Sequence, residues 1–188
     1  MLVHIFWDSQ SPDGFQVPVS RIISSVLSIR TIIGENPVRI MGYVDERRQV
    51  DAQTLLDSLQ AYKHRHHMTQ PVLLVVHQDL FRNGNSFVFG LAREQVGAGV
   101  VSTARLGNEF YRRQNSDDDY IDRIAKEGAH EIGHLIGLPH CTDRECVMFR
   151  PDTLDELDRK KKSLCPACRQ RRDAILAIQE PAGARRAS

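Results

Sequence analysis

The sequence predicts an α/β fold in which helices pack on a mixed, twisted β-sheet. Strand-like and helix-like segments alternate along the first half of the chain, in the order β-α-β-α-β-β-β. Residues 71–80, PVLLVVHQDL, are an apolar run of strand length, typical of a strand buried on both faces. The 188 residues, 41% hydrophobic and 26% charged, suit one globular domain rather than a disordered chain.

The elements before this run follow from their apolar patterns. Residues 2–7, LVHIFW, read as a short buried strand. Residues 17–34 carry isoleucine, valine and leucine at helical spacing, and Gly34 is expected to end that helix. Residues 38–44, VRIMGYV, alternate like a strand, and residues 51–67 form a second amphipathic helix.

After the buried run, two more strands are expected at residues 85–92 and 97–106, joined by the turn-like sequence REQVG. Residues 107–116 read as a loop, and a long helix is predicted over residues 117–137. Aspartates suit the positive end of its macrodipole, and Gly137 ends it.

The C-terminal segments complete the prediction. Asp152 is expected to cap a short helix over residues 152–162, and CPAC to open a final helix that runs to about residue 179.

Charge and hydropathy limit the partners. The formal net charge is only +1, which gives no reason to expect nucleic acid or an anionic membrane as partner. No apolar run approaches the roughly 20 residues that span a bilayer, and the first residues lack the basic segment of a secretory signal. The expected location is therefore the cytoplasm.

A metal-ligand pattern lies on the long predicted helix. His130 and His134 are four residues apart, so both imidazoles project from one face and can share one Zn²⁺. Glu131 occupies the next position round the helix, where it can reach a water on the metal. If Gly137 takes a left-handed conformation, the chain turns back and brings His140 beneath the metal as third ligand.

A bare HExxH also arises by chance, and a histidine pair on a helix is usually solvated or hydrogen-bonded in a core. The helix-ending glycine and the third histidine make coincidence a poorer explanation. Three ligands leave a fourth position open, which is the arrangement of a catalytic rather than a structural zinc.

All four cysteines lie in one short segment, as Cys141-x₄-Cys146 and Cys165-x₂-Cys168. In a reducing compartment, clustered cysteines are more often metal ligands than disulfides, and this spacing can close a tetrahedral structural zinc site. Two disulfides, four unlinked thiols and a redox-active CxxC pair remain as alternatives.

HEIGHLIGLPH matches the metzincin signature H-E-x-x-H-x-x-G-x-x-H, and Met148 is the natural candidate for the methionine turn of that clan. Residues 130–148 together with CPAC resemble the archaemetzincin family, whose pattern is HExxHxxGx₃Cx₄CxMx₁₇CxxC. The chain departs from this pattern only in the last gap, which has 16 residues here. Residues 85–106 also resemble the strand pair that precedes the family's active-site helix.

The resemblance implies a metzincin-like catalytic domain over residues 1–180. Residues 1–137 would hold the sheet and the active-site helix, and residues 138–180 a small subdomain with the Cys₄ zinc. Residues 181–188 would be a flexible tail.

The resemblance also implies a zinc metallopeptidase, a hydrolase with two Zn²⁺ per chain, one catalytic and one structural. Glu131 would be its general base. The peptide or protein substrate would lie along an edge strand, for which the candidate residues are Phe87, Val88, Phe89, Gly90 and Leu91. A monomer is expected.

Two other functions compete with this one. The first is a metzincin-fold zinc-binding protein that binds peptide or protein with little or no proteolysis. The second is a zinc-ribbon nucleic-acid module, suggested by Arg169, Arg171 and Arg172, although a solvated face explains these arginines more simply. His64, His66 and His67 are interpreted as a solvated cationic helix end rather than a metal site.

Overall fold

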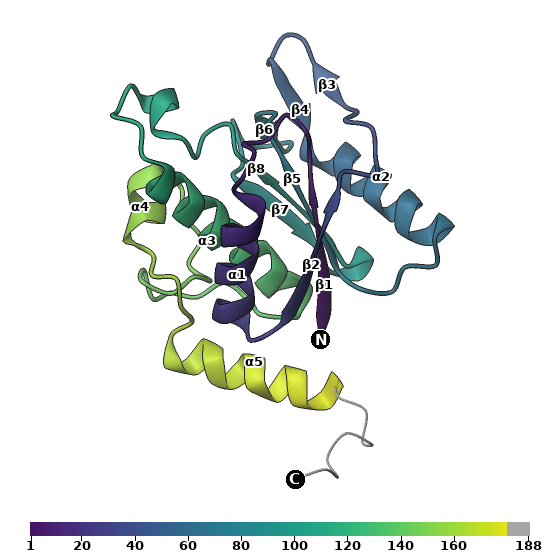
Figure 1. Cartoon of the computed structure of the whole chain (residues 1–188), viewed down its shortest axis with the longest axis vertical. Helices are drawn as coiled ribbons and strands as arrows, with labels where there is room; N and C mark the ends of the chain where they lie inside the picture. The colour runs from purple at the N-terminus through teal and green to yellow at the C-terminus, as the bar shows by residue number, and fades with distance from the viewer. Residues whose placement is uncertain (180–188) are drawn as a thin grey trace.

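The computed structural model describes residues 1–179 and contains a five-stranded mixed sheet (Figure 1). The strand order is β2 (Arg30–Glu35), β1 (Leu2–Trp7), β5 (Val72–Val76), β8 (Ala98–Ser102) and β7 (Gly90–Arg93). The first four strands are parallel, and β7 runs antiparallel to β8 at one edge. A second, small sheet joins β3 (Tyr43–Val44), β4 (Gln49–Asp51) and β6 (Leu80–Phe81).

Helices cover both faces of the large sheet (Figure 1). On one face lie α1 (Gln16–Leu27) and α3 (Asp117–Leu135), and on the other lies α2 (Ala52–Arg65). The C-terminal part adds α4 (Leu154–Arg159), which contacts α3, and α5 (Pro166–Gln179). Two 3₁₀ turns, η1 (Glu94–Val96) and η2 (Asn108–Tyr111), lie in the connections. None of the helices within residues 1–179 is both long and apolar enough to cross a membrane.

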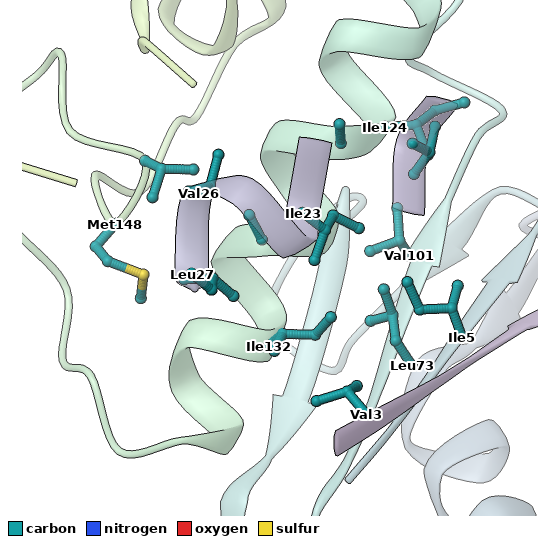
Figure 2. Packing of buried hydrophobic residues seen from close by; sticks show 14 of the residues in the cluster. Val3, Ile5, Ile23, Val26, Leu27, Leu73, Val101, Ile124, Ile132 and Met148 are labelled. Atoms are coloured by element: carbon teal, nitrogen blue, oxygen red, sulfur yellow. The ribbon is translucent and has the colours of Figure 1, made fainter. Parts of the chain in front are cut away.

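The core on the α1 and α3 face supports α3, the helix that carries His130 and His134 (Figure 2). Val3 and Ile5 of β1 and Leu73 of β5 pack there against Ile23 of α1 and Ile132 of α3. The alternate residues of these strands face α2, so β5 is buried on both faces, as its continuous apolar run predicts.

The helix predicted for residues 17–34 is wrong in its second half. The helix ends at Leu27, because Ser28 adopts a left-handed conformation (φ 53°), and Arg30–Glu35 form strand β2 parallel to β1. Residues 31–33 are β-branched and suit either period in so short a run, so pairing with β1 decides the outcome. Gly34 does not end a helix but pairs with Phe6.

Several other predicted boundaries also change. The strand expected at residues 38–44 shrinks to β3, and the one expected at residues 85–92 begins only at Gly90. Thr153, not Asp152, caps α4 by accepting a hydrogen bond from the N–H of Glu156 (3.3 Å). The loop at residues 107–116 contains η2, and the predicted tail, residues 181–188, lies outside the described residues.

Helix α3 begins and ends as its sequence predicts. The Ser116 hydroxyl accepts a hydrogen bond from the N–H of Asp119 (3.2 Å), and three aspartates occupy the first turn. At the other end, Gly137 has a φ of 97°. The chain there reverses, and the Leu138 N–H donates to the Gly133 carbonyl at 2.9 Å. This reversal sets the position of the residues that follow.

Candidate active site and metal centres

Three histidines meet at the C-terminal end of α3. His130 and His134 project from the same face of the helix, and the turn at Gly137 returns His140 to them. One ligand nitrogen from each of the three residues lies within 4.8 Å of the others. The structure thus brings together the three histidines that the sequence predicts to meet.

The hydrogen bonds of two of these histidines define where their lone pairs point. Nδ1 of His130 lies 2.9 Å from the Val147 carbonyl oxygen, and Nδ1 of His134 lies 2.9 Å from the Leu138 carbonyl oxygen. A carbonyl only accepts, so each Nδ1 carries the proton and each Nε2 presents a lone pair. The two Nε2 atoms lie 3.1 Å apart.

Two facing lone pairs at this distance repel each other unless a cation lies between them. Two nitrogens bound at 2.0–2.1 Å to one tetrahedral Zn²⁺ would be roughly 3.3 Å apart, close to the observed separation. The donor set therefore fits a zinc ion.

The surroundings keep these imidazoles neutral. Burial lowers the pKa of His130 well below its ordinary value, and the Lys160 cation lowers it further. Burial also lowers the pKa of His134, and the nearby His140 lowers it further. Burial likewise lowers the pKa of His140, and the Arg150 cation adds to that shift. A neutral imidazole keeps the lone pair that a metal requires.

Glu131 is buried between α3 and the sheet and lines the same cleft as the histidines. Burial raises its pKa well above the ordinary value, and the neighbouring Glu127 raises it further, while Lys160 opposes the shift. A divalent cation at the histidines would favour the ionised carboxylate.

Met148 lies directly against the active-site helix. It is fully buried, and a Cβ at Gly133 would collide with its sulfur. The residue before it, Val147, supplies the carbonyl that orients His130, and the Met148 carbonyl accepts the N–H of Cys141 at 3.0 Å. The loop that carries Met148 therefore contacts both the histidine cluster and the first cysteine.

The four cysteines form a second cluster next to the first. Their sulfurs all lie within 4.8 Å of one another, with Cys141 Sγ and Cys165 Sγ 3.8 Å apart. Two thiolates at about 2.3 Å from one tetrahedral zinc would be roughly 3.8 Å apart, whereas a disulfide requires about 2.05 Å. All four thiols are free in the structure, so the alternative of two disulfide bonds is not what the structure contains.

The cleft above the histidines has a volume of about 680 Å³. Residues 85–95, which include β7, form one wall, and Arg150, Pro151 and Asp152 line it as well. The three histidines and Glu131 lie along this cleft. Of the residues predicted as the substrate edge, Gly90 and Leu91 lie in β7. Phe87, Val88 and Phe89 precede the strand, with Val88 bridged to Leu80.

Comparison with known proteins decides the family. The profile of peptidase family M54 matches residues 24–173. The chain belongs to this family.

Individual members agree with the assignment. An archaemetzincin from Thermococcus kodakarensis is 43% identical over 93 residues, which is half of each chain. A zinc-dependent peptidase from Methanocorpusculum labreanum is 40% identical and superposes with a TM-score of 0.86, covering 90% of this chain and 99% of that one. An archaemetzincin structure from Methanopyrus kandleri is 31% identical, with a TM-score of 0.75 over 94% and 96% of the two chains.

These matches confirm three predictions: archaemetzincin membership, the mixed α/β fold and the class of zinc metallopeptidase, which acts on peptides. Within residues 1–179 of this M54 peptidase, the His cluster and the Cys cluster are the groups that could hold a metal ion.

Sequence reasoning missed a buried ion pair beside the active site. Lys160 Nζ donates to Glu127 Oε1 at 3.0 Å, with 0% of the lysine side chain and 3% of the glutamate side chain exposed. Glu127 lies one turn before Glu131 and lines the cleft. Lys160 is hidden in the sequence because it belongs to the run Arg159–Lys162, which resembles an ordinary solvated charge cluster.

The basic residues singled out in the sequence differ in their exposure. His64, His66 and His67 are exposed at the C-terminal end of α2, as predicted. Arg172 is buried, contrary to the predicted solvated face, and donates to the Val26 carbonyl (3.2 Å) and the Ser28 hydroxyl (2.9 Å). Because Arg172 holds α5 against α1, it does not belong to a basic surface for nucleic acid.

Proposed function

We propose that His130, His134 and His140 hold the catalytic zinc of this peptidase and that Glu131 is its general base. The observation that carries the proposal is the convergence of two imidazole lone pairs, 3.1 Å apart, with a third histidine close by. The ligands line an open cleft rather than a sealed core, so a fourth coordination position would face the substrate.

Zn²⁺ at this position would supply a water of lowered pKa and a Lewis acid for the scissile carbonyl. Glu131 would accept the proton of the attacking water as the carbon–oxygen bond forms. It would then return that proton to the amine nitrogen as the carbon–nitrogen bond breaks. The carbonyls of Val147 and Leu138 would hold His130 and His134 in the tautomer that leaves Nε2 free.

A second, structural zinc is proposed at the four cysteines. Four thiolates leave no open position, so this ion would stabilise the fold rather than take part in the reaction. Met148 would form the methionine turn between the two centres. Each chain would then bind two zinc ions, and the free thiols suit the reducing cytoplasm.

The substrate is proposed to pair with the open edge of β7. The Ser102 N–H donates to the Phe89 carbonyl at 2.8 Å, and hydrogen-bonded and non-hydrogen-bonded pairs alternate along an antiparallel ladder. The backbone groups of Gly90 and Ala92 would therefore point away from β8, toward the cleft. The proposed edge therefore begins at Gly90 and extends to Ala92, one residue beyond the predicted range 87–91.

The same proposal treats the protein as a monomer with one catalytic domain. Buried residues from both parts of the predicted domain, residues 1–137 and 138–180, share one hydrophobic cluster, which supports a single folding unit. The buried members that lie between the two pairs of cysteines are Val147, Met148, Leu154, Leu157 and Leu164.

The test is a diverse quenched-peptide library cleaved by the wild-type protein and by Glu131→Gln, with the zinc content measured for both. We expect two zinc ions per chain in each protein and a ~10²–10⁴-fold lower kcat for the variant, the usual contribution of a general base. Wild-type cleavage rates in Glu131→Gln with full zinc content would refute the assigned role. One zinc per chain would refute the proposal of two centres.

A further inference from the structure

The Glu131 side chain packs against the sheet at two positions where glycine leaves room for it. A Cβ on Gly90 of β7 would lie 2.6 Å from Glu131 Oε1, 2.8 Å from its Cγ and 2.9 Å from its Cδ. A Cβ on Gly99 of β8 would lie 3.5 Å from Glu131 Cβ. Gly99 pairs with Ala92, so Gly90 and Gly99 are on the same face of the sheet.

The backbone does not require glycine at either position. Gly90 and Gly99 are absent from the glycines with positive φ, and alanine can adopt the strand conformation of both. Space is what excludes a side chain at Gly90, because Cβ atoms do not approach other heavy atoms to 2.6 Å. Because only 5% of Glu131 is exposed, a side chain at residue 90 would have to be accommodated by a shift of Glu131 within the site.

We propose that Gly90 is a positioning residue for the general base, which rests on the role proposed above for Glu131. The bare backbone of Gly90 sets how closely the carboxylate approaches the sheet, because three consecutive atoms of the Glu131 side chain pack against it. Displacement of a catalytic group by about 1 Å can cost 10²-fold in rate, so this spacing matters for turnover.

The same glycine would also bind the substrate. Its backbone groups are those proposed above to face the open edge of β7, while its missing side chain leaves room for the base. A single residue would therefore set the separation between Glu131 and the peptide that pairs with β7. A side chain at Gly90 would change that separation without removing any metal ligand.

The experiment adds one methyl group at three glycines of the zinc-loaded enzyme. Gly90→Ala is expected to lower kcat by ~10²-fold with KM changed less than about twofold. The new methyl of Gly99→Ala would lie near the Cβ of Glu131 rather than near its carboxylate, so we expect kcat to fall by less than about fivefold. Gly107→Ala is the matched control: its φ is −76°, and the new methyl would lie 3.5 Å from the Tyr120 ring. Its kcat should be unchanged.

A double-mutant cycle with Glu131→Asp separates positioning from general damage. The shorter side chain withdraws its carboxylate from residue 90, so Gly90→Ala should cost less than about threefold in the Glu131→Asp background. Equal fold-losses in the two backgrounds would overturn the inference. A crystal structure of Gly90→Ala in which the Glu131 carboxylate has not moved would also overturn the inference. This structural test remains decisive even if Glu131→Asp turns over too slowly to measure.

The outcomes also separate this inference from the proposed function. Wild-type activity in Glu131→Gln would refute the general base itself. A fully active Gly90→Ala together with an inactive Glu131→Gln would refute only the positioning role.

Discussion

The histidine cluster and the cysteine cluster share a border at the peptide bond between His140 and Cys141, yet they are built differently. The histidine cluster takes two ligands from one rigid turn of α3 and opens onto a cleft. The cysteine cluster takes its ligands from a loop and from the region where α5 begins, and Cys146 and Cys168 are buried. The helix holds His130 and His134 at the right spacing before any metal binds, whereas the two cysteine pairs belong to segments 18 residues apart that must be brought together.

The difference indicates what each ion would contribute. An ion at the histidines would add reactivity to a geometry that already exists, and an ion at the cysteines would hold segments together.

Cys165→Ser should cause the largest loss. Structural zinc contributes about 10–16 kcal/mol of binding free energy in zinc-finger peptides, and part of that free energy here would hold the C-terminal segment on α3. We expect one zinc fewer per chain and no cooperative thermal unfolding of the native domain. Metal analysis and calorimetry measure both, with Ser163→Ala as control two residues away. Unchanged zinc content and Tm would remove the proposed Cys₄ centre.

His140→Ala should strongly reduce activity and spare the fold. The metal is expected to supply several kcal/mol of transition-state stabilisation, so loss of its third ligand should lower kcat/KM by about 10²–10³-fold. Circular dichroism and Tm should match the wild-type protein, with the cysteine-bound zinc retained. His64→Ala, an exposed histidine at the end of α2, is the control. A variant that unfolds would show that the two clusters are not separable in this way.

Lys160→Met examines the connection between the two regions. Lys160 lies between α4 and the second cysteine pair, and Glu127 lies on α3, so their buried ion pair joins the C-terminal segment to the active-site helix. Removing one partner leaves a buried charge and should cost about 3–5 kcal/mol of unfolding free energy. The double variant Lys160→Met with Glu127→Leu should recover most of it in denaturant titration. A single variant of wild-type stability would contradict a buried ion pair.

Thr153→Ala should have the smallest effect. The loss of its cap on α4 should reduce the unfolding free energy by about 1 kcal/mol and lower Tm by about 2–4 °C. Thr69→Ala, at an exposed position, serves as control for the loss of a threonine hydroxyl. Equal Tm values for the two variants would mean that the cap contributes nothing to the C-terminal segment.

The histidine and cysteine clusters could be predicted because the spacing within each motif is local. His130 and His134 need only the helical repeat, and His140 needs only the left-handed turn at Gly137, both of which are visible in the sequence. The cysteine pairs are likewise two short motifs. The error at residues 30–35 has the opposite cause: a run of β-branched residues is compatible with two periods, and only its long-range pairing with β1 resolves it.

The sequence by itself determined the chemistry of the protein: three imidazoles, one carboxylate and four thiols at spacings that suit metal binding, within a mixed α/β chain. Only the tertiary structure decided what surrounds those groups. It brings Lys160 to Glu127 across 33 residues, buries Arg172 against α1 and places Gly90 beneath Glu131. The physical reason is that ligand spacing depends on local backbone geometry, whereas burial, charge pairing and close approach depend on segments distant in sequence.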